Sequence, residues 1–239
     1  MPLTGHAFDL EDLPRWTVGA SAHVAKLDDA YYLVMPVALV GAAPEGIREF
    51  AREFVEQLNG AGRLLDPGFQ AVQLGETLYG LNEAGQRAHV VLSISSGTLR
   101  LKGGHVTISV GGEAQPDHRV GAAVPLLEAA RQSAAARDAL VLVGRQQPTW
   151  SELYLAFELV EANTGRQMFA AGWISRSDER LFSQTANSYT ALGRQARHGK
   201  TTRNPPSAPM SLTRATELVR QLVGAWLKRE FPRRVGSAV

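Results

Sequence analysis

The pattern of apolar residues changes near the middle of the chain, and this change constrains the fold more than any other feature. Before about residue 120, short apolar segments rich in β-branched and aromatic residues are separated by glycine-containing turns, which is typical of strands. After Gly121, apolar residues recur at three- and four-residue spacing, which is typical of helices. We therefore expect an α+β domain over residues 1–120, built on an antiparallel sheet, followed by an all-α helical bundle over residues 121–239.

The first half contains one clear strand pattern and one clear helix pattern. Ala30–Val40 has the composition of a strand, but Pro36 cannot donate to a strand ladder, so we expect an edge strand or two short pieces. Pro44–Asn59 has helical apolar spacing, begins with proline and is followed by Gly60, which predicts one amphipathic helix. Weaker patterns predict strands at 16–24, 70–74, 89–95, 98–101 and 105–110, with a tight turn at 103–104.

The second half is predicted to consist of helices. Thr149 and Glu152 have the spacing of a capping box and predict a helix that ends at residues 163–165. Ala139–Val143 is compatible with a helix or a buried strand, and its neighbours favour a helix. The other helices are expected at 122–137, at 178–199 and from an N-cap at Ser211.

The composition excludes several classes of protein. The 239 residues include no cysteine, so disulfides, zinc–thiolate sites and cysteine nucleophiles are excluded. The N-terminal residues lack the pattern of a signal peptide, and no apolar stretch approaches the ~18 to 20 residues that cross a bilayer. We therefore expect a cytoplasmic protein that makes no contact with a membrane and needs no cofactor.

Charge is distributed unequally along the chain. Residues 1–118 hold eight basic and fourteen acidic side chains, whereas residues 119–239 hold seventeen and nine. This excess of positive charge indicates a polyanionic or acidic partner for the second half, or docking of the two halves on each other. The basic residues from Lys228 to Arg234 could join Arg214 and Arg220 in a phosphate-binding patch, although a solvated terminus is the simpler interpretation.

One group of residues in the predicted helix 178–199 has the chemistry of a phosphodiester-cleaving site. On a helical wheel, Arg180, Asn187, Arg194 and His198 fall on one face, with Arg194 and His198 at i, i+4. The guanidinium would bind phosphate, the imidazole would act as acid or base, and the amide would position the group, without a metal. The alternative is the solvated face of an amphipathic helix, in which basic residues of the last turn complement the helix dipole.

The same region resembles a known group of proteins. The pattern comprises Trp150–Glu161, Trp173, Ala186-Asn187, Arg197-His198-Gly199 and the closing helix Pro209–Leu227. It is similar to the C-terminal region of uncharacterised bacterial proteins that look like remote members of the HEPN superfamily of helical bundles. The resemblance covers roughly residues 148–230 and does not include the first half.

The resemblance implies a function and its alternative. Members of the superfamily are often ribonucleases of toxin–antitoxin or anti-phage systems, with an Arg and a His separated by four to six residues across a dimer cleft. Arg194 and His198 are the nearest match to that motif. Together with the helical-wheel pattern, we therefore expect a homodimer that binds RNA through Arg180, Arg197 and Arg203 and, if catalytic, cleaves it with Asn187, Arg194 and His198. Three residues separate Arg194 from His198 here. That shorter spacing favours an alternative function, in which the bundle is a non-catalytic dimerisation scaffold with a protein partner. A third interpretation is a small-molecule sensor.

Overall fold

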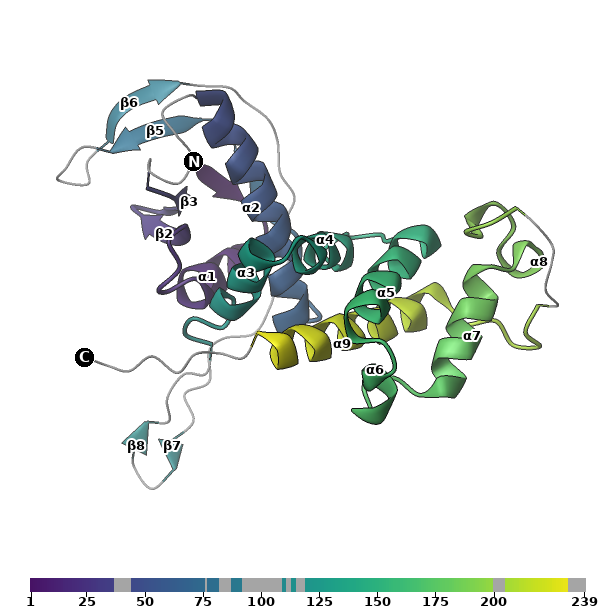
Figure 1. Ribbon diagram of the computed structural model, residues 1–239. Helices are drawn as coiled ribbons and strands as arrows, with labels where there is room; N and C mark the ends of the chain where they lie inside the picture. The colour runs from purple at the N-terminus through teal and green to yellow at the C-terminus, as the bar shows by residue number, and fades with distance from the viewer. Residues whose placement is uncertain are drawn as a thin grey trace. The chain divides into compact units, whose positions relative to one another are not determined.

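The computed structural model describes residues 1–36, 44–75, 77–81, 87–91, 109–110, 113–114, 119–199 and 205–231 (Figure 1). The chain forms two compact units. The first comprises residues 1–58 and 69–124, and the second comprises residues 59–68 and 125–239. An antiparallel sheet lies in the first unit and most of the helices lie in the second, which confirms the α+β class.

The sheet of the first unit has four antiparallel strands in the order β2-β3-β1-β4. They are β1 Pro2–Thr4, β2 His23–Leu27, β3 Ala30–Val34 and β4 Gln73–Leu74. The strand predicted from Ala30 is confirmed as far as Val34, just before Pro36, and residues 37–40 lie outside the described part. The strand predicted at 16–24 is wrong over most of its length, because Trp16 ends a helix and only residues 23–24 join β2.

In the described part of this unit, a second helix precedes the one predicted. Helix α1 (Ala7–Trp16) was not predicted, because Pro14 inside it and its acidic residues conceal the helical pattern. It buries Leu10, Leu13 and Trp16, and the Trp16 ring lies 5.6 Å from that of Phe69.

Helix α2 (Pro44–Leu65) begins as predicted but continues five residues beyond Gly60. Its residues from Asn59 onward belong to the second unit.

The remaining strands form two short antiparallel pairs. They are β5 Leu78–Leu81 with β6 Arg87–Val91, and β7 Ser109–Val110 with β8 Glu113–Ala114. Part of the strand predicted at 89–95 is therefore confirmed in β6, and the end of the strand predicted at 105–110 is confirmed in β7. The strand predicted at 98–101 and the turn at 103–104 lie outside the described residues.

The second unit is a helical bundle in which α5 contacts α4, α6, α7 and α9 (Figure 1). Thr149 and Glu152 form the predicted capping box at the start of α5, and Ser211 caps α9 as predicted. Residues 139–143 are helical, as favoured, but Ser133 interrupts the helix predicted at 122–137 by capping a new one. The helices are α3 Val124–Gln132, α4 Ala134–Val143, α5 Trp150–Thr164, α6 Gln167–Ala170, α7 Arg176–Ala186, α8 Tyr189–Leu192 and α9 Leu212–Glu230, with a 3₁₀ turn η2 at Gly193–Gln195.

The core of this unit contains a cluster of aromatic rings between α5 and α7. The Phe182 ring lies 5.6 to 6.1 Å from those of Trp150, Tyr154 and Phe157. Trp150, Phe157 and Phe182 are fully buried, so the cluster anchors α7 on α5. In the described part of the chain, no helix combines the length and the apolar character required to cross a membrane.

A close crossing of helix backbones explains why α2 does not end at Gly60. A Cβ atom on Gly60 would lie 2.0 Å from the carbonyl oxygen of Leu140 in α4. Gly144 is the C-cap residue of α4. Its carbonyl oxygen accepts a 3.0 Å hydrogen bond from the Nε of Arg63, three residues after Gly60. The Arg220 Nε donates to the adjacent Val143 carbonyl at 3.2 Å. Two arginines therefore satisfy carbonyl groups that a helix end leaves unpaired.

Candidate nucleic-acid interface

The single continuous helix predicted over 178–199 is wrong, because it is interrupted after Ala186. Helix α7 ends there, and the side chains of the next two residues bond to nearby backbone groups. The Asn187 Nδ2 donates to the Ser183 carbonyl oxygen at 2.9 Å. The Ser188 Oγ accepts a hydrogen bond from the Ala191 N–H at 3.2 Å. Asn and Ser side chains compete with helical hydrogen bonding in this way. The released Ala186 carbonyl oxygen accepts a hydrogen bond from the Arg197 N–H at 2.8 Å.

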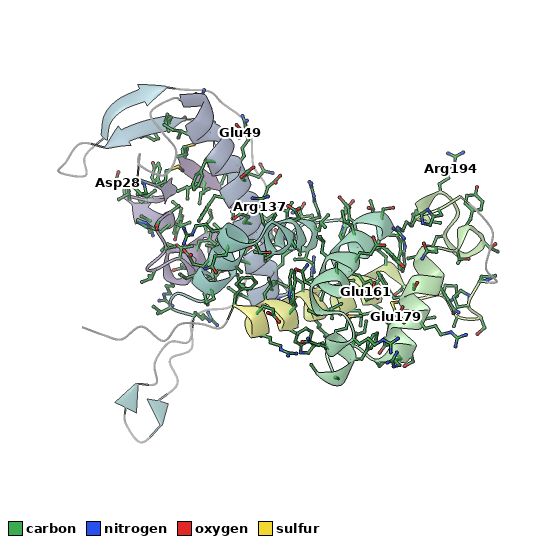
Figure 2. The ribbon with its side chains drawn as sticks, viewed as in Figure 1. Asp28, Glu49, Arg137, Glu161, Glu179 and Arg194 are labelled. Atoms are coloured by element: carbon green, nitrogen blue, oxygen red, sulfur yellow. The ribbon has the colours of Figure 1, made fainter. Side chains whose placement is uncertain are left out.

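The interruption removes the geometry that aligned Arg194 with His198. Helix α8 lasts four residues and is followed by η2, where Gly193 has a φ of 56°. Arg194 lies in η2, is exposed and extends into solvent (Figure 2). His198 is exposed and lies outside any helix. The two residues therefore do not form an i, i+4 pair on one helical face.

Asn187 retains one polar atom without a partner. It is half-buried, and its Oδ1 is inaccessible to solvent and accepts no hydrogen bond from the described residues. No hydrogen bond or ion pair joins any two of Asn187, Arg194, Arg197 and His198 in the part of the chain that the structure describes. Among the described residues, the structure therefore provides no bonded cluster of these predicted site residues.

Arg197 is held inside the bundle by contacts from α5. Its Nη2 donates to both carboxylate oxygens of Glu158, at 3.0 and 3.2 Å, and its guanidinium lies 4.2 Å from the centre of the Tyr154 ring. Glu158 therefore balances its charge. Arg180 is exposed on α7 and has no carboxylate within 4.0 Å in the described chain. Arg203 lies outside the described residues.

Two other arginines also stack on aromatic rings but have no acidic partner. The Arg176 guanidinium lies 4.6 Å from the centre of the Phe169 ring, and that of Arg229 lies 5.5 Å from the centre of the Trp173 ring. Both arginines are exposed, both rings are half-buried, and no carboxylate among the described residues lies within 4.0 Å of either guanidinium. We refer to Phe169, Trp173, Arg176 and Arg229 as the arginine–aromatic surface.

A Schellman turn after α6 fixes the backbone that carries the two rings. The Trp173 N–H donates to the Met168 carbonyl oxygen at 3.0 Å, and the Gly172 N–H donates to that of Phe169 at 3.1 Å. Gly172 has a φ of 70°, the left-handed conformation that this turn requires. Met168 is completely buried, so the turn is anchored in the bundle. Phe169 and Trp173 therefore belong to one ordered segment.

The second unit leaves a surplus of basic side chains at its surface. Five carboxylates pair with arginines: Glu128, Asp138, Glu152, Glu158 and Asp178. Six exposed basic residues have no carboxylate within 4.0 Å among the described residues: Arg166, Arg176, Arg180, Arg194, Lys228 and Arg229. Glu161, Glu179, Glu217 and Glu230 also lack such an ion pair there.

Burial lowers the pKa of Arg220, and nearby Glu217 opposes this shift.

The arginine–aromatic surface does not follow from sequence patterns, because one of its ring–cation pairs spans distant segments. Arg229 belongs to the basic end of the chain, where few aromatic residues are close in sequence. The fold brings the ring of Trp173, in the segment after α6, beneath the guanidinium of Arg229. The local pattern Phe169–Trp173–Arg176 was a usable signal, because it places two aromatic residues and a cation within eight positions.

Comparisons with known proteins provide no assignment. No protein-family model, curated protein or solved structure matches the chain. The resemblance to HEPN bundles therefore stays a prediction. Among the described residues, no three His, Asp or Glu side chains come together in a way that could hold a metal ion.

Proposed function

We propose that the second unit binds RNA and that the arginine–aromatic surface provides the contacts. The observation that carries the proposal is that Arg176 and Arg229 are exposed, are stacked on rings and have no carboxylate within 4.0 Å in the described chain. Their guanidinium N–H donors are therefore available for phosphate oxygens. A free arginine loses up to ~2 kcal/mol of side-chain conformational freedom when it is immobilised, and a ring beneath the guanidinium reduces that loss on binding.

The type of basic residue supports phosphate recognition. Of the seventeen basic residues after position 118, fifteen are arginine and two are lysine. A guanidinium binds phosphate through two parallel hydrogen bonds and stacks on planar groups, whereas an ammonium acts as a point charge. This preference for arginine favours nucleic acid over a partner that requires positive charge alone.

The proposal is limited to binding. Cleavage was predicted from Arg180, Asn187, Arg194 and His198 on one helical face, and that helix ends at Ala186. Homodimerisation, a cytoplasmic location and a role in defence remain predictions from the sequence.

The test compares two double variants that remove the same charge. Arg176→Gln/Arg229→Gln removes the proposed phosphate contacts. Arg131→Gln/Arg137→Gln is the matched control, because Arg131 is exposed, the Arg137 side chain is 44 % exposed, and their ion pairs join them to Glu128 and Asp138 on their own helices. Such surface pairs contribute about 0 to 1 kcal/mol to stability, so the control should fold normally.

Binding of a fluorescent, unstructured RNA to the full chain is measured by anisotropy over a series of salt concentrations. Each phosphate contact to a single strand contributes about 0.7 to the slope of log affinity against log salt. We expect the Arg176/Arg229 variant to lose roughly 1.4 of that slope and at least about ten-fold in affinity at low salt, whereas the control keeps both. Equal slopes and affinities in the two variants, or no binding by the unaltered protein at low salt, would overturn the proposal.

A further inference from the structure

The arginine–aromatic surface places two exposed guanidinium groups over aromatic rings. The guanidinium carbon lies 4.6 Å from the centre of the Phe169 ring in Arg176 and 5.5 Å from that of Trp173 in Arg229. Both arginines are exposed, so each carries a planar group that a base can reach from solvent. Arg197 has the same stacking on Tyr154, but it is half-buried and its Nη2 is engaged by Glu158. Of these three arginines, only Arg176 and Arg229 therefore combine an exposed planar group with N–H donors that no carboxylate engages.

These rings and guanidiniums have chemistry that suits unpaired bases. A base stacks on an aromatic ring or on a guanidinium plane, and its phosphate accepts hydrogen bonds from the guanidinium edge. In a duplex, neighbouring bases already cover the base faces, so a double strand could reach the surface only through its phosphates. Both rings are half-buried, and the Schellman turn orders the backbone that carries them, which reduces the ordering required on binding.

Resting on the proposed function, we propose that the arginine–aromatic surface selects single-stranded polynucleotide, with bases stacking at Arg176/Phe169 and at Arg229/Trp173. Phosphate contact alone would give no preference for single strands, because a duplex has the higher charge density. Stacking adds a contribution that only unpaired bases can make. RNA and DNA single strands share this chemistry, so both are tested.

The tryptophans of the chain allow stacking to be observed at one position. The chain has four tryptophans, and Trp16, Trp150 and Trp226 are each at most 3 % exposed. Trp173 is half-buried and lies beneath Arg229. Quenching of intrinsic tryptophan fluorescence by an added oligonucleotide therefore reports on Trp173. A Trp173→Phe variant should lose the quenching while keeping a ring for stacking.

The experiment titrates the full chain with an unlabelled RNA single strand, a DNA single strand of the same sequence and the corresponding duplexes. We expect both single strands to quench the fluorescence and to bind at least about ten-fold more tightly than the duplexes. We expect Arg176→Lys/Arg229→Lys, which keeps the charge but removes the planes, to lose that preference while still binding in low salt. Trp173→Leu, which keeps an apolar side chain but removes the ring, should reduce the preference several-fold.

The outcomes separate this inference from the function on which it rests. Binding without quenching and with equal affinity for single strands and duplexes would overturn single-strand selection and leave phosphate binding intact. A lysine variant that keeps the full preference would also overturn it, because charge would then suffice. If no polynucleotide binds the unaltered protein, both proposals are wrong. Circular dichroism of each variant checks that the bundle is folded.

Discussion

Substitution of Gly60 by alanine should strongly destabilise the second unit. A Cβ at this position would lie 2.0 Å from the carbonyl oxygen of Leu140 and 2.6 Å from its carbonyl carbon. Real Cβ atoms essentially never approach closer than 3.0 Å, so the two backbones would have to separate by about 1 Å. Both are helix backbones packed in the core, and neither can rotate away as a side chain would.

The expected magnitude follows from three contributions. Overpacking a core costs about 1 to 3 kcal/mol. Separation of the helices also strains the hydrogen bond from the Arg63 Nε to the Gly144 carbonyl oxygen, and a bond to a charged group contributes about 1.5 to 3 kcal/mol. Alanine regains about 1 kcal/mol through its helix propensity. We expect Gly60→Ala to lower the free energy of unfolding by about 3 kcal/mol.

Gly224→Ala is the matched control, because Gly224 also lies inside a helix of the second unit. Its Cβ would meet only the Leu64 Cδ2, at an ordinary contact distance of 3.8 Å. Alanine should therefore stabilise α9 by up to about 1 kcal/mol. Urea denaturation followed by circular dichroism and tryptophan fluorescence measures both variants. A Gly60→Ala protein as stable as Gly224→Ala would refute the close approach of the two backbones.

Two further predictions concern a half-buried ion pair and a buried amine. Arg197→Ala should lower the free energy of unfolding by about 1 to 2 kcal/mol, because it removes the contacts with Glu158 and Tyr154; unchanged thermal stability would contradict this. Burial lowers the pKa of the Met1 amino group from 8.0 to about 6 while it donates to the Leu33 carbonyl oxygen. The unfolded chain therefore binds more protons between these values, and stability should fall by up to about 2 kcal/mol as the pH drops from 8 to 6. Urea denaturation of the acetylated and free-amine forms measures this difference, and identical pH profiles would exclude it.

Much of the second unit was predictable because its signals are local. The capping box of Thr149 and Glu152 and the N-cap at Ser211 depend on residues within one helical turn, so the sequence specifies them directly. The apolar stripe of α9 likewise predicted which residues are buried, among them Val219, Leu222 and Trp226. The same logic predicted the class of the fold, because strand and helix periodicities occur in separate halves.

The interruptions of helices were less predictable, because a helix sometimes continues through a residue that disfavours it and sometimes ends there. Gly60 looks like a stop signal, yet α2 continues through it since only glycine allows the approach to Leu140. Asn187 lies in a segment with helical spacing, yet α7 ends there and the freed carbonyl of Ala186 accepts a hydrogen bond from Arg197. Long-range packing decides between these outcomes, and no local pattern records it.

The order of the residues specifies the surplus of arginine in the second half, the two kinds of secondary structure and the residues that cap several helices. Which arginines keep their charge available depends instead on how the helices pack. Arg197 meets Glu158, which lies 39 positions away, whereas Arg229 meets Trp173 and no carboxylate among the described residues. Charge and ring content are properties of composition, but the neutralisation of a charge depends on which side chains the packed helices bring within a few ångströms.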